Sequence, residues 1–281
     1  MTPTDPIVST SWLASRLGER KTAPMDASWF MPGVSRDPKA EFALTHIPGA
    51  RFFAIDEVCD HQTDLPHMLA SPQSFTAAMR TLGVDHDATV VAYDSHGLFS
   101  AARLWWTLRA MGHDDVVVLD GGLPRWRAEG RPLEQGWPAV GPGDFEAAPR
   151  PALVRDLAAM QRLVAEGSAQ IIDARGGARF RGEAPEPRPG LRSGHMPGAK
   201  NLPFDQLIEN GSLRDATALS DVFLAAGVDL SRPLVTTCGS GLTASVLALG
   251  LARLGRWDAA VYDGSWSEWG AEANTPVESG P

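Results

Sequence analysis

Short apolar runs alternate with longer segments of helical period in the second half of the chain. Three short, mostly apolar runs predict buried strands: 170–173, 234–237 and 259–262. Three segments with apolar residues at helical spacing predict helices: 156–165, 216–226 and 242–254. Strands that alternate with helices predict an α/β fold, in which helices cover both faces of a mainly parallel sheet.

Three short segments of the first half return in the second half in the same order. Segment 46–50 returns as 195–199, 90–94 as 234–238, and 120–122 as 263–265, at offsets of 149, 144 and 143 residues. Such collinear matches indicate a duplicated domain of about 130–140 residues. A stretch rich in Gly and Pro, 136–151, predicts a linker between the copies. We therefore expect two tandem domains, residues 1–145 and 146–281.

The charge and the cysteine count narrow the class of protein. Lys and Arg number 25 and Asp and Glu 34, and the resulting net charge of −9 disfavours binding to nucleic acid. The chain has no apolar run of the roughly 18 residues that would suit a membrane span. Two cysteines cannot form a disulfide framework, and the first 11 residues lack the pattern of a signal peptide. These features predict a cytoplasmic protein that binds neither nucleic acid nor membrane.

One of the two cysteines follows a predicted strand directly. Cys238 directly follows the run 234–237. It begins a loop of small residues, Gly239-Ser240-Gly241, that leads into a predicted helix. Ligand sites in α/β sheets form beyond the carboxyl ends of strands. A glycine-rich loop at a helix N-terminus directs backbone N–H groups at an anion, and this favours a nucleophilic thiolate and stabilises an anionic adduct such as a persulfide. The alternative is a small, buried, inert Cys238.

The sequence fits other functions of cysteine, in a phosphatase loop or a zinc site, less well. Cys59 has no glycine loop around it, and we interpret it as structural or incidental. Phosphatases with a cysteine loop need an Arg six positions later to clamp phosphate, and Ala244 stands there. A zinc site from Asp56, Cys59, His61 and His67 has suitable ligand types but loose spacing. We therefore expect no metal and no organic cofactor.

The chain resembles the two-domain sulfurtransferases of the rhodanese superfamily. The resemblance covers nearly the whole chain and depends on the loop 238–244, the two His-x-Pro-Gly-Ala segments, 173–175 with 179–182, 187–188 and 262–269. It implies two tandem rhodanese-like domains, of which only the second is catalytic. In agreement, the first copy has Asp94 where the second has Cys238.

The composition of the loop implies the sulfur donor. Members that use thiosulfate tend to carry Cys-Arg-Lys-Gly, whereas Cys-Gly-Ser-Gly, as at 238–241, is typical of members that use 3-mercaptopyruvate. Leu242 replaces the commoner Val. The resemblance thus implies a sulfurtransferase in which Cys238 takes sulfur from 3-mercaptopyruvate and releases pyruvate. The resulting persulfide would pass its sulfur to a thiol, thioredoxin or cyanide.

The resemblance also implies a set of site residues. Arg179 and Arg188 match substrate arginines, which would hold the donor's carboxylate and carbonyl. Ser240, His67 and Asp56 match a proton relay in which Asp56 orients the His67 imidazole. The other loop residues would contact the donor: Gly239, Gly241, Leu242 and Thr243.

Taken alone, several of these residues have plainer interpretations. The Arg- and Pro-rich stretch 179–192 is typical of a solvated loop, and a lone histidine such as His67 is typical of packing. His46 and His195 recur in the duplicate and indicate a scaffold role, and the nine Trp residues suit a core. Two other functions stay open: a thiosulfate sulfurtransferase, and a non-catalytic module that carries a persulfide.

Overall fold

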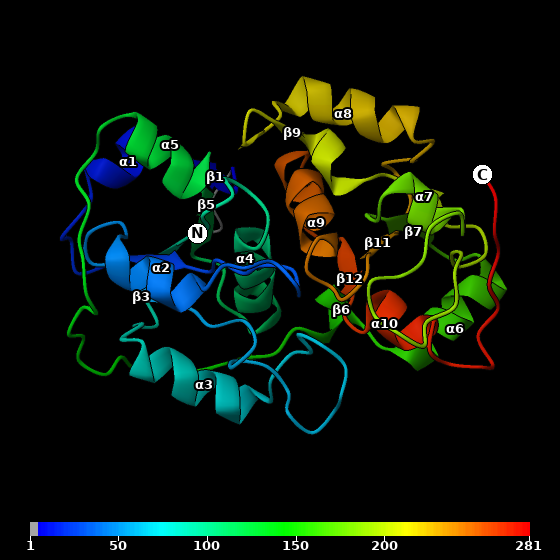
Figure 1. The fold of residues 1–281 in the computed structure, drawn as a ribbon, viewed down its shortest axis with the longest axis horizontal. Coiled ribbons are helices and arrows are strands. Elements are labelled where there is room, and N and C mark those ends of the chain that lie inside the picture. Colours follow the sequence, from blue (N-terminus) through cyan, green and yellow to red (C-terminus); the bar gives the residue numbers. More distant parts are fainter. Residues whose placement is uncertain (1–4) are drawn as a thin grey trace. The chain divides into compact units, whose positions relative to one another are not determined.

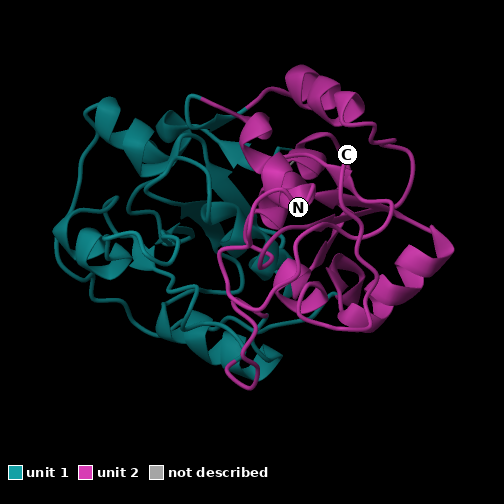
Figure 2. Ribbon diagram, turned by 45° about the vertical axis from the view of Figure 1, so that its right-hand side comes forward, with its two compact units in different colours: residues 1–60, 69–150, 210–213 teal, residues 61–68, 151–209, 214–281 magenta. Residues whose placement is uncertain are grey.

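The computed structural model describes residues 5–281, so residues 1–4, which belong to the expected first domain and to the N-terminal stretch considered above, lie outside the described residues. The chain folds as two compact units (Figure 2). Unit 1 holds the described residues up to Asp60, Leu69–Arg150 and Asn210–Leu213. Unit 2 holds His61–Met68, Pro151–Glu209 and Arg214–Pro281. The residues on either side of His61–Met68 belong to unit 1, although that segment is counted with unit 2. Likewise Asn210–Leu213 is counted with unit 1, although the residues on either side of it belong to unit 2.

Unit 1 is built on a five-stranded sheet in the order β1-β5-β4-β2-β3, with every neighbouring pair parallel. Its strands are β1 (Ile7–Val8), β2 (Thr22–Asp26), β3 (Arg51–Phe52), β4 (Thr89–Tyr93) and β5 (Val116–Leu119). Its helices are α1 (Thr10–Ala14), α2 (Pro38–Leu44), α3 (Pro72–Thr81), α4 (Ala101–Ala110) and α5 (Gly122–Ala128). Side chains of α1, α2 and α5 form one cluster with β4 and β5, whereas α4 packs separately on the same two strands.

Unit 2 repeats this arrangement with the order β6-β12-β11-β7-β8, again parallel throughout. Its strands are β6 (Val154–Arg155), β7 (Gln170–Asp173), β8 (Lys200–Asn201), β11 (Leu234–Thr237) and β12 (Ala260–Tyr262). Its helices are α6 (Leu157–Glu166), α7 (Gly177–Phe180), α8 (Ala216–Ala225), α9 (Ala244–Arg253) and α10 (Ser265–Trp269), with 3₁₀ turns η1 (Pro151–Leu153) and η2 (Phe204–Leu207). The remaining strands are β9 (Ile208–Glu209) and β10 (Ser212–Leu213), of which β10 is counted with unit 1. Figure 1 labels most of the elements of both units. The predicted α/β class, with two parallel sheets flanked by helices, is confirmed.

Local chemistry explains where the helices begin and end. The Asp156 carboxylate accepts a hydrogen bond from Ala159 N at 2.7 Å and caps α6, which ends at Gly167 in the left-handed region. Ser71 caps α3 in the same way, with Pro72 in its first turn. Helix α9 begins at Ala244, two residues later than predicted, because the residues before it belong to the loop that follows β11.

Tryptophans fill the core of both units. Trp126 of α5 is buried in the cluster of unit 1, and Trp266 and Trp269 of α10 are buried in that of unit 2. The central strands β4 and β11 are buried almost throughout. Within residues 5–281, no helix combines the length and apolarity needed to cross a bilayer.

Candidate active site

Cys238 lies at the carboxyl end of the middle strand of unit 2. Strand β11 is flanked by β7 and β12, and Cys238 follows its last residue with only 2% of its surface exposed. The loop then turns at Gly241, where φ is +75°, and enters α9. A positive φ at this point suits glycine because a side chain there would be strained. The predicted strand–loop–helix context of Cys238 is therefore present.

The first turn of α10 holds this loop in shape. The Ser265 hydroxyl accepts hydrogen bonds from Cys238 N at 3.2 Å and Gly241 N at 3.0 Å, and donates to Tyr262 O at 2.8 Å. The N–H and hydroxyl of Ser267 both donate to Gly239 O, at 2.8 and 2.7 Å. Sequence reasoning missed both serines. The available signal was the change from Gly122 in the first copy to Ser265 in the second.

Ser265 adopts a conformation that serine avoids. Its φ is +51° and its side chain is fully buried. The left-handed region costs a non-glycine residue roughly 1–2 kcal/mol. Strain of this kind is retained where the surrounding contacts require it and is concentrated at functional sites. Here the strained residue is the one that binds the backbone of the cysteine loop.

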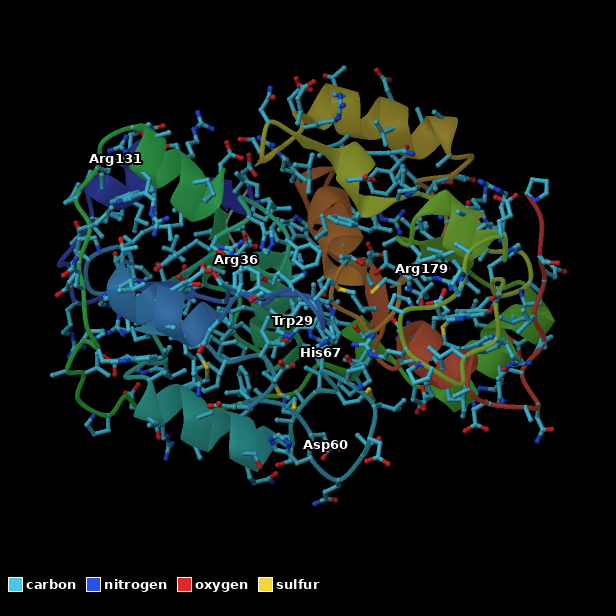
Figure 3. The ribbon with its side chains drawn as sticks, in the orientation of Figure 1. Trp29, Arg36, Asp60, His67, Arg131 and Arg179 are labelled. Carbon is cyan, nitrogen blue, oxygen red and sulfur yellow. The ribbon has the colours of Figure 1, made fainter. Side chains whose placement is uncertain are left out.

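Arg179 brings a positive charge to the loop. It lies in α7 (Figure 3), and its Nη2 atom is 3.2 Å from the position that a Cβ atom on Gly239 would occupy. A side chain at position 239 would therefore require the guanidinium to shift by a few tenths of an ångström. Arg179 is in turn bound by the Glu186 carboxylate, which also accepts a hydrogen bond from Arg175 Nη1 at 2.8 Å. Glu186 is a further residue that sequence reasoning missed, since a Pro-Glu-Pro run is typical of a solvated loop.

Neighbouring arginines have structural partners instead. Arg192 donates to the carbonyl oxygens of Trp269 and Thr275, both at 2.8 Å, and ties the C-terminal segment to the loop before β8. Arg181 pairs with Glu183 at the surface. Arg188 lies partly buried in the irregular segment after α7. Arg179 thus differs from Arg181 and Arg192 in lying beside Gly239, and the donor-binding roles of Arg179 and Arg188 both stay predictions.

The predicted relay is divided between the two units. Ser240 is buried beside Cys238 in unit 2, and His67 is buried in the segment counted with the same unit, at a φ of +62°. Asp56 belongs to unit 1, where its Oδ2 accepts a hydrogen bond from Trp29 Nε1 at 2.8 Å. Trp29 was not among the predicted residues. The relay itself stays a prediction.

In unit 1 the residue that corresponds to Cys238 is an acid held by backbone donors. Asp94 follows β4, is fully buried, and accepts five backbone hydrogen bonds of 2.7–2.9 Å. The donors are the N–H groups of His96, Gly97, Phe99, Ser100 and Ala101. The backbone N–H groups of the loop after β4 are therefore arranged to bind a carboxylate.

The remaining candidates of the sequence analysis are the possible metal ligands, Cys59 and the two repeated histidines, His46 and His195. Across the described part of the chain, no three His, Cys, Asp or Glu side chains are grouped to hold a metal ion. Cys59 is half-buried and donates from Sγ to Asp56 O at 3.2 Å, and burial together with the Asp56 charge raises its pKa. His46 and His195 both stack on a phenylalanine, Phe42 and Phe180 respectively, which agrees with a scaffold role.

Comparisons with known proteins agree with this geometry. The family model described as "Rhodanese-like domain" matches residues 9–129 and 156–272. The chain is 44% identical over 272 residues to "3-mercaptopyruvate sulfurtransferase" of Escherichia coli strain K12, covering 96% of this chain and 97% of that protein. It is 42% identical to the human protein of the same name, covering 94% and 91% of the two chains.

Two further comparisons extend this result. The chain is 43% identical to "Thiosulfate/3-mercaptopyruvate sulfurtransferase 1, mitochondrial" of Arabidopsis thaliana, covering 98% of this chain and 78% of that protein. The crystal structure of SseA from Escherichia coli superposes with a TM-score of 0.87 at 41% identity and covers 94% of this chain and all of that one. The family model, the sequence identity and the shared fold lead to one conclusion: the chain belongs to the rhodanese family of sulfurtransferases.

Proposed function

We propose that this protein is a 3-mercaptopyruvate sulfurtransferase with Cys238 as the sulfur carrier. The observation that carries the proposal is the position of Cys238, buried at the end of β11 in a Cys-Gly-Ser-Gly loop with the Arg179 guanidinium beside Gly239. The relatives named for this activity in Escherichia coli and human, at 44% and 42% identity, support it.

The reaction has two sulfur-transfer steps. The Cys238 thiolate attacks the sulfur of 3-mercaptopyruvate, the carbon–sulfur bond breaks, and its electron pair stays on the pyruvate fragment as an enolate. Protonation of the enolate gives pyruvate and leaves a persulfide on Cys238. The thiolate of an acceptor then attacks the outer sulfur and restores the Cys238 thiolate. No redox cofactor is consumed, because the cysteine itself carries the group.

Each predicted site residue has a task in this reaction. Arg179 and Arg188 hold the carboxylate and carbonyl of the donor through charge-assisted hydrogen bonds. Ser240, His67 and Asp56 deliver the proton to the enolate. The backbone N–H groups of Ser240 and Thr243 stabilise the sulfur anion, as the corresponding groups of His96 and Phe99 in unit 1 bind the Asp94 carboxylate.

The domains, acceptor and compartment complete the proposal. Residues 1–145 are the non-catalytic rhodanese-like domain and residues 146–281 the catalytic one. The acceptor is a small thiol, reduced thioredoxin or cyanide. The enzyme works in the cytoplasm, where a reducing environment keeps the Cys238 thiol available; the mitochondrial name of one plant relative makes the mitochondrion the alternative.

Thiosulfate is the second candidate donor, since the Arabidopsis relative is named for both compounds. The composition of the loop argues against it as the preferred donor. Gly239 and Ser240 carry no charge, so the loop lacks the basic side chains that would hold a dianion beside Cys238.

Steady-state turnover of the purified protein tests the proposal. With a thiol acceptor present, we expect pyruvate release from 3-mercaptopyruvate with a kcat/KM above that for thiosulfate. A higher kcat/KM for thiosulfate would reverse the donor assignment. Absence of turnover with either donor would favour a non-catalytic persulfide carrier.

A further inference from the structure

We propose that Glu186 is a positioning residue, which clamps one edge of the Arg179 guanidinium and leaves its other edge to bind the carboxylate of the donor. The inference rests on the proposed function, because it assigns Arg179 to the donor. It extends that function to a residue that touches only arginines.

The contacts of Glu186 define the clamp. Its Oε1 accepts a hydrogen bond from Arg179 Nε at 3.2 Å, and its Oε2 accepts one from Arg179 Nη2. The side chain is 1% exposed, so this carboxylate has exchanged water for guanidinium donors. A buried carboxylate is strongly unfavourable unless such partners satisfy it, and Glu186 is therefore committed to this geometry.

The clamp uses only one side of the guanidinium fork. Nε and Nη2 face Glu186, whereas Nη1 has no hydrogen-bond acceptor within residues 5–281. The Arg179 side chain is 27% exposed, and its Nη2 lies 3.2 Å from the position of a Cβ atom on Gly239. The pair Nη1 and Nη2 can therefore receive a second carboxylate in a bidentate manner while Glu186 keeps its own bonds.

Arg175 anchors the clamp from behind. Its side chain is 1% exposed and lies over the Trp266 ring at 4.1 Å. It donates to Glu186 Oε1 at 2.8 Å and to Asp173 Oδ2 at 2.7 Å. The two guanidinium groups and two carboxylates are balanced in charge before any donor arrives. Arg179 is thus held in one orientation in advance, and the ordering of a long side chain does not weaken donor binding.

The same segment provides a matched control. Glu183 binds Arg181 with the same side-on geometry, Nε to Oε1 at 2.9 Å and Nη2 to Oε2 at 2.7 Å. These side chains are 57% and 39% exposed, so the pair is solvated rather than buried. Glu183→Gln removes the same charge from the same loop, and exposed pairs of this kind contribute little.

The experiment compares steady-state kinetics of the full chain with 3-mercaptopyruvate. For Glu186→Gln we expect KM to rise about tenfold with kcat within about threefold of wild type, the size of effect expected when a charged hydrogen bond is lost. Glu183→Gln should keep both values. In an Arg179→Ala background, Glu186→Gln should raise KM no further, because the residue that it positions is gone. Glu186→Asp, which keeps the charge, should restore part of the lost affinity.

Other results would overturn the proposal. A purely structural Glu186 would lower kcat through a loss of folded enzyme and leave KM unchanged in both the Gln and the Asp variants. An equal rise in KM from Glu186→Gln with and without Arg179 would place its effect elsewhere. Failure of the wild-type protein to release pyruvate would instead overturn the proposed function itself, so the two failures are distinguishable.

Discussion

Asp94 and Cys238 occupy equivalent places in two sheets of the same strand order, each directly after the middle strand. In unit 1 the loop beyond the strand closes on the Asp94 carboxylate with five backbone N–H groups. In unit 2 the residue at this position is Cys238, whose side chain is shorter than that of Asp94 and ends in a thiol instead of a carboxylate. The same strand–loop–helix turn thus binds an acid of the chain itself in unit 1, whereas in unit 2 we propose that it binds the sulfur of Cys238.

The two units also differ at the residue that packs against this loop, which is Gly122 in unit 1 and Ser265 in unit 2. Gly122 and Ser265 have nearly identical φ values of +52° and +51°, but only Gly122 adopts this conformation without strain. A Cβ atom on Gly122 would lie 2.5 Å from Asp94 O, so unit 1 has no room for a side chain there. In unit 2 the Ser265 hydroxyl binds Cys238 N and Gly241 N instead. The strained residue, Ser265, is thus found in the unit that contains Cys238.

A third difference concerns a buried acid at the end of the neighbouring strand. In unit 2 Asp173 pairs with Arg175, whereas in unit 1 Asp26 has Ser28 at the corresponding position. Burial raises the pKa of Asp26 to about 6, and the nearby Asp94 charge adds to this although bonds from Ser28 and Tyr93 oppose it. Unit 1, which lacks the loop cysteine, therefore contains a buried acid that has no cationic partner among the described residues.

The largest expected effect comes from removing the thiol. Cys238→Ser should lower sulfur transfer by at least about a thousandfold, because a hydroxyl cannot accept and release sulfur. Cys59→Ser is the matched control and should keep most activity, since Cys59 lies in unit 1 away from any glycine loop. Pyruvate release and thermal melting of both variants check this. Turnover that persists in Cys238→Ser would contradict the assignment.

Asp94→Asn should break the anion site of unit 1. The amide keeps one acceptor but directs its NH₂ group at backbone donors, and loss of one partner from a buried charged network costs about 3–5 kcal/mol. We expect the free energy of unfolding of unit 1 to fall by this amount in denaturant titrations. Asp120→Asn, at a partly exposed surface pair, is the control and should change little. An unchanged stability in Asp94→Asn would show that its carboxylate is not bound as an anion.

Asp26→Asn should change how the free energy of unfolding depends on pH. The folded pKa of about 6 lies above the ordinary value of 3.8, so the folded protein holds a proton that the unfolded chain has released, and stability falls as pH rises from about 4 to about 6. The difference corresponds to about 3 kcal/mol at most. The variant should match wild type near pH 3.5 and exceed it in stability at pH 7.5. A wild-type curve that rises through this window relative to the variant would have the wrong sign.

Two substitutions at Ser265 separate strain from hydrogen bonding. Ser265→Gly introduces the residue of unit 1 and should change stability little, since relief of strain offsets the lost hydroxyl bonds. Ser265→Ala keeps the strain without the bonds and should be about 1 kcal/mol less stable than the glycine variant. Both should lower kcat/KM about tenfold, because each loses the hydroxyl bonds to the loop. Wild-type kcat/KM in either variant would mean that the loop keeps its shape without Ser265.

The sequence predicts the parts of this fold that depend on local pattern. The short runs 170–173 and 234–237 are rich in β-branched residues, and they form β7 and β11 with these bounds. The edge strands β1, β3, β6 and β8 have two residues each, too few to show a period. The cysteine loop could be located because strand, glycines and helix are contiguous in sequence.

Residues that act across long sequence separations could not be located in this way. Ser265 lies 27 residues from Cys238 and binds it only once α10 has packed beside β11. Glu186 stands between two prolines, and its burial depends on Arg175 and Arg179. The exchange of the segments 61–68 and 210–213 between the units likewise has no sequence signal.

The central claim, that Cys238 carries sulfur from a small donor, is tested most directly by mass spectrometry. The purified protein is exposed to 3-mercaptopyruvate without an acceptor, and its intact mass and peptides are then measured. We predict a gain of one sulfur atom, located on the peptide that contains Cys238, absent from Cys238→Ser and lost again when a thiol is added. A gain of sulfur on Cys59, or an unchanged mass while pyruvate is released, would contradict the account.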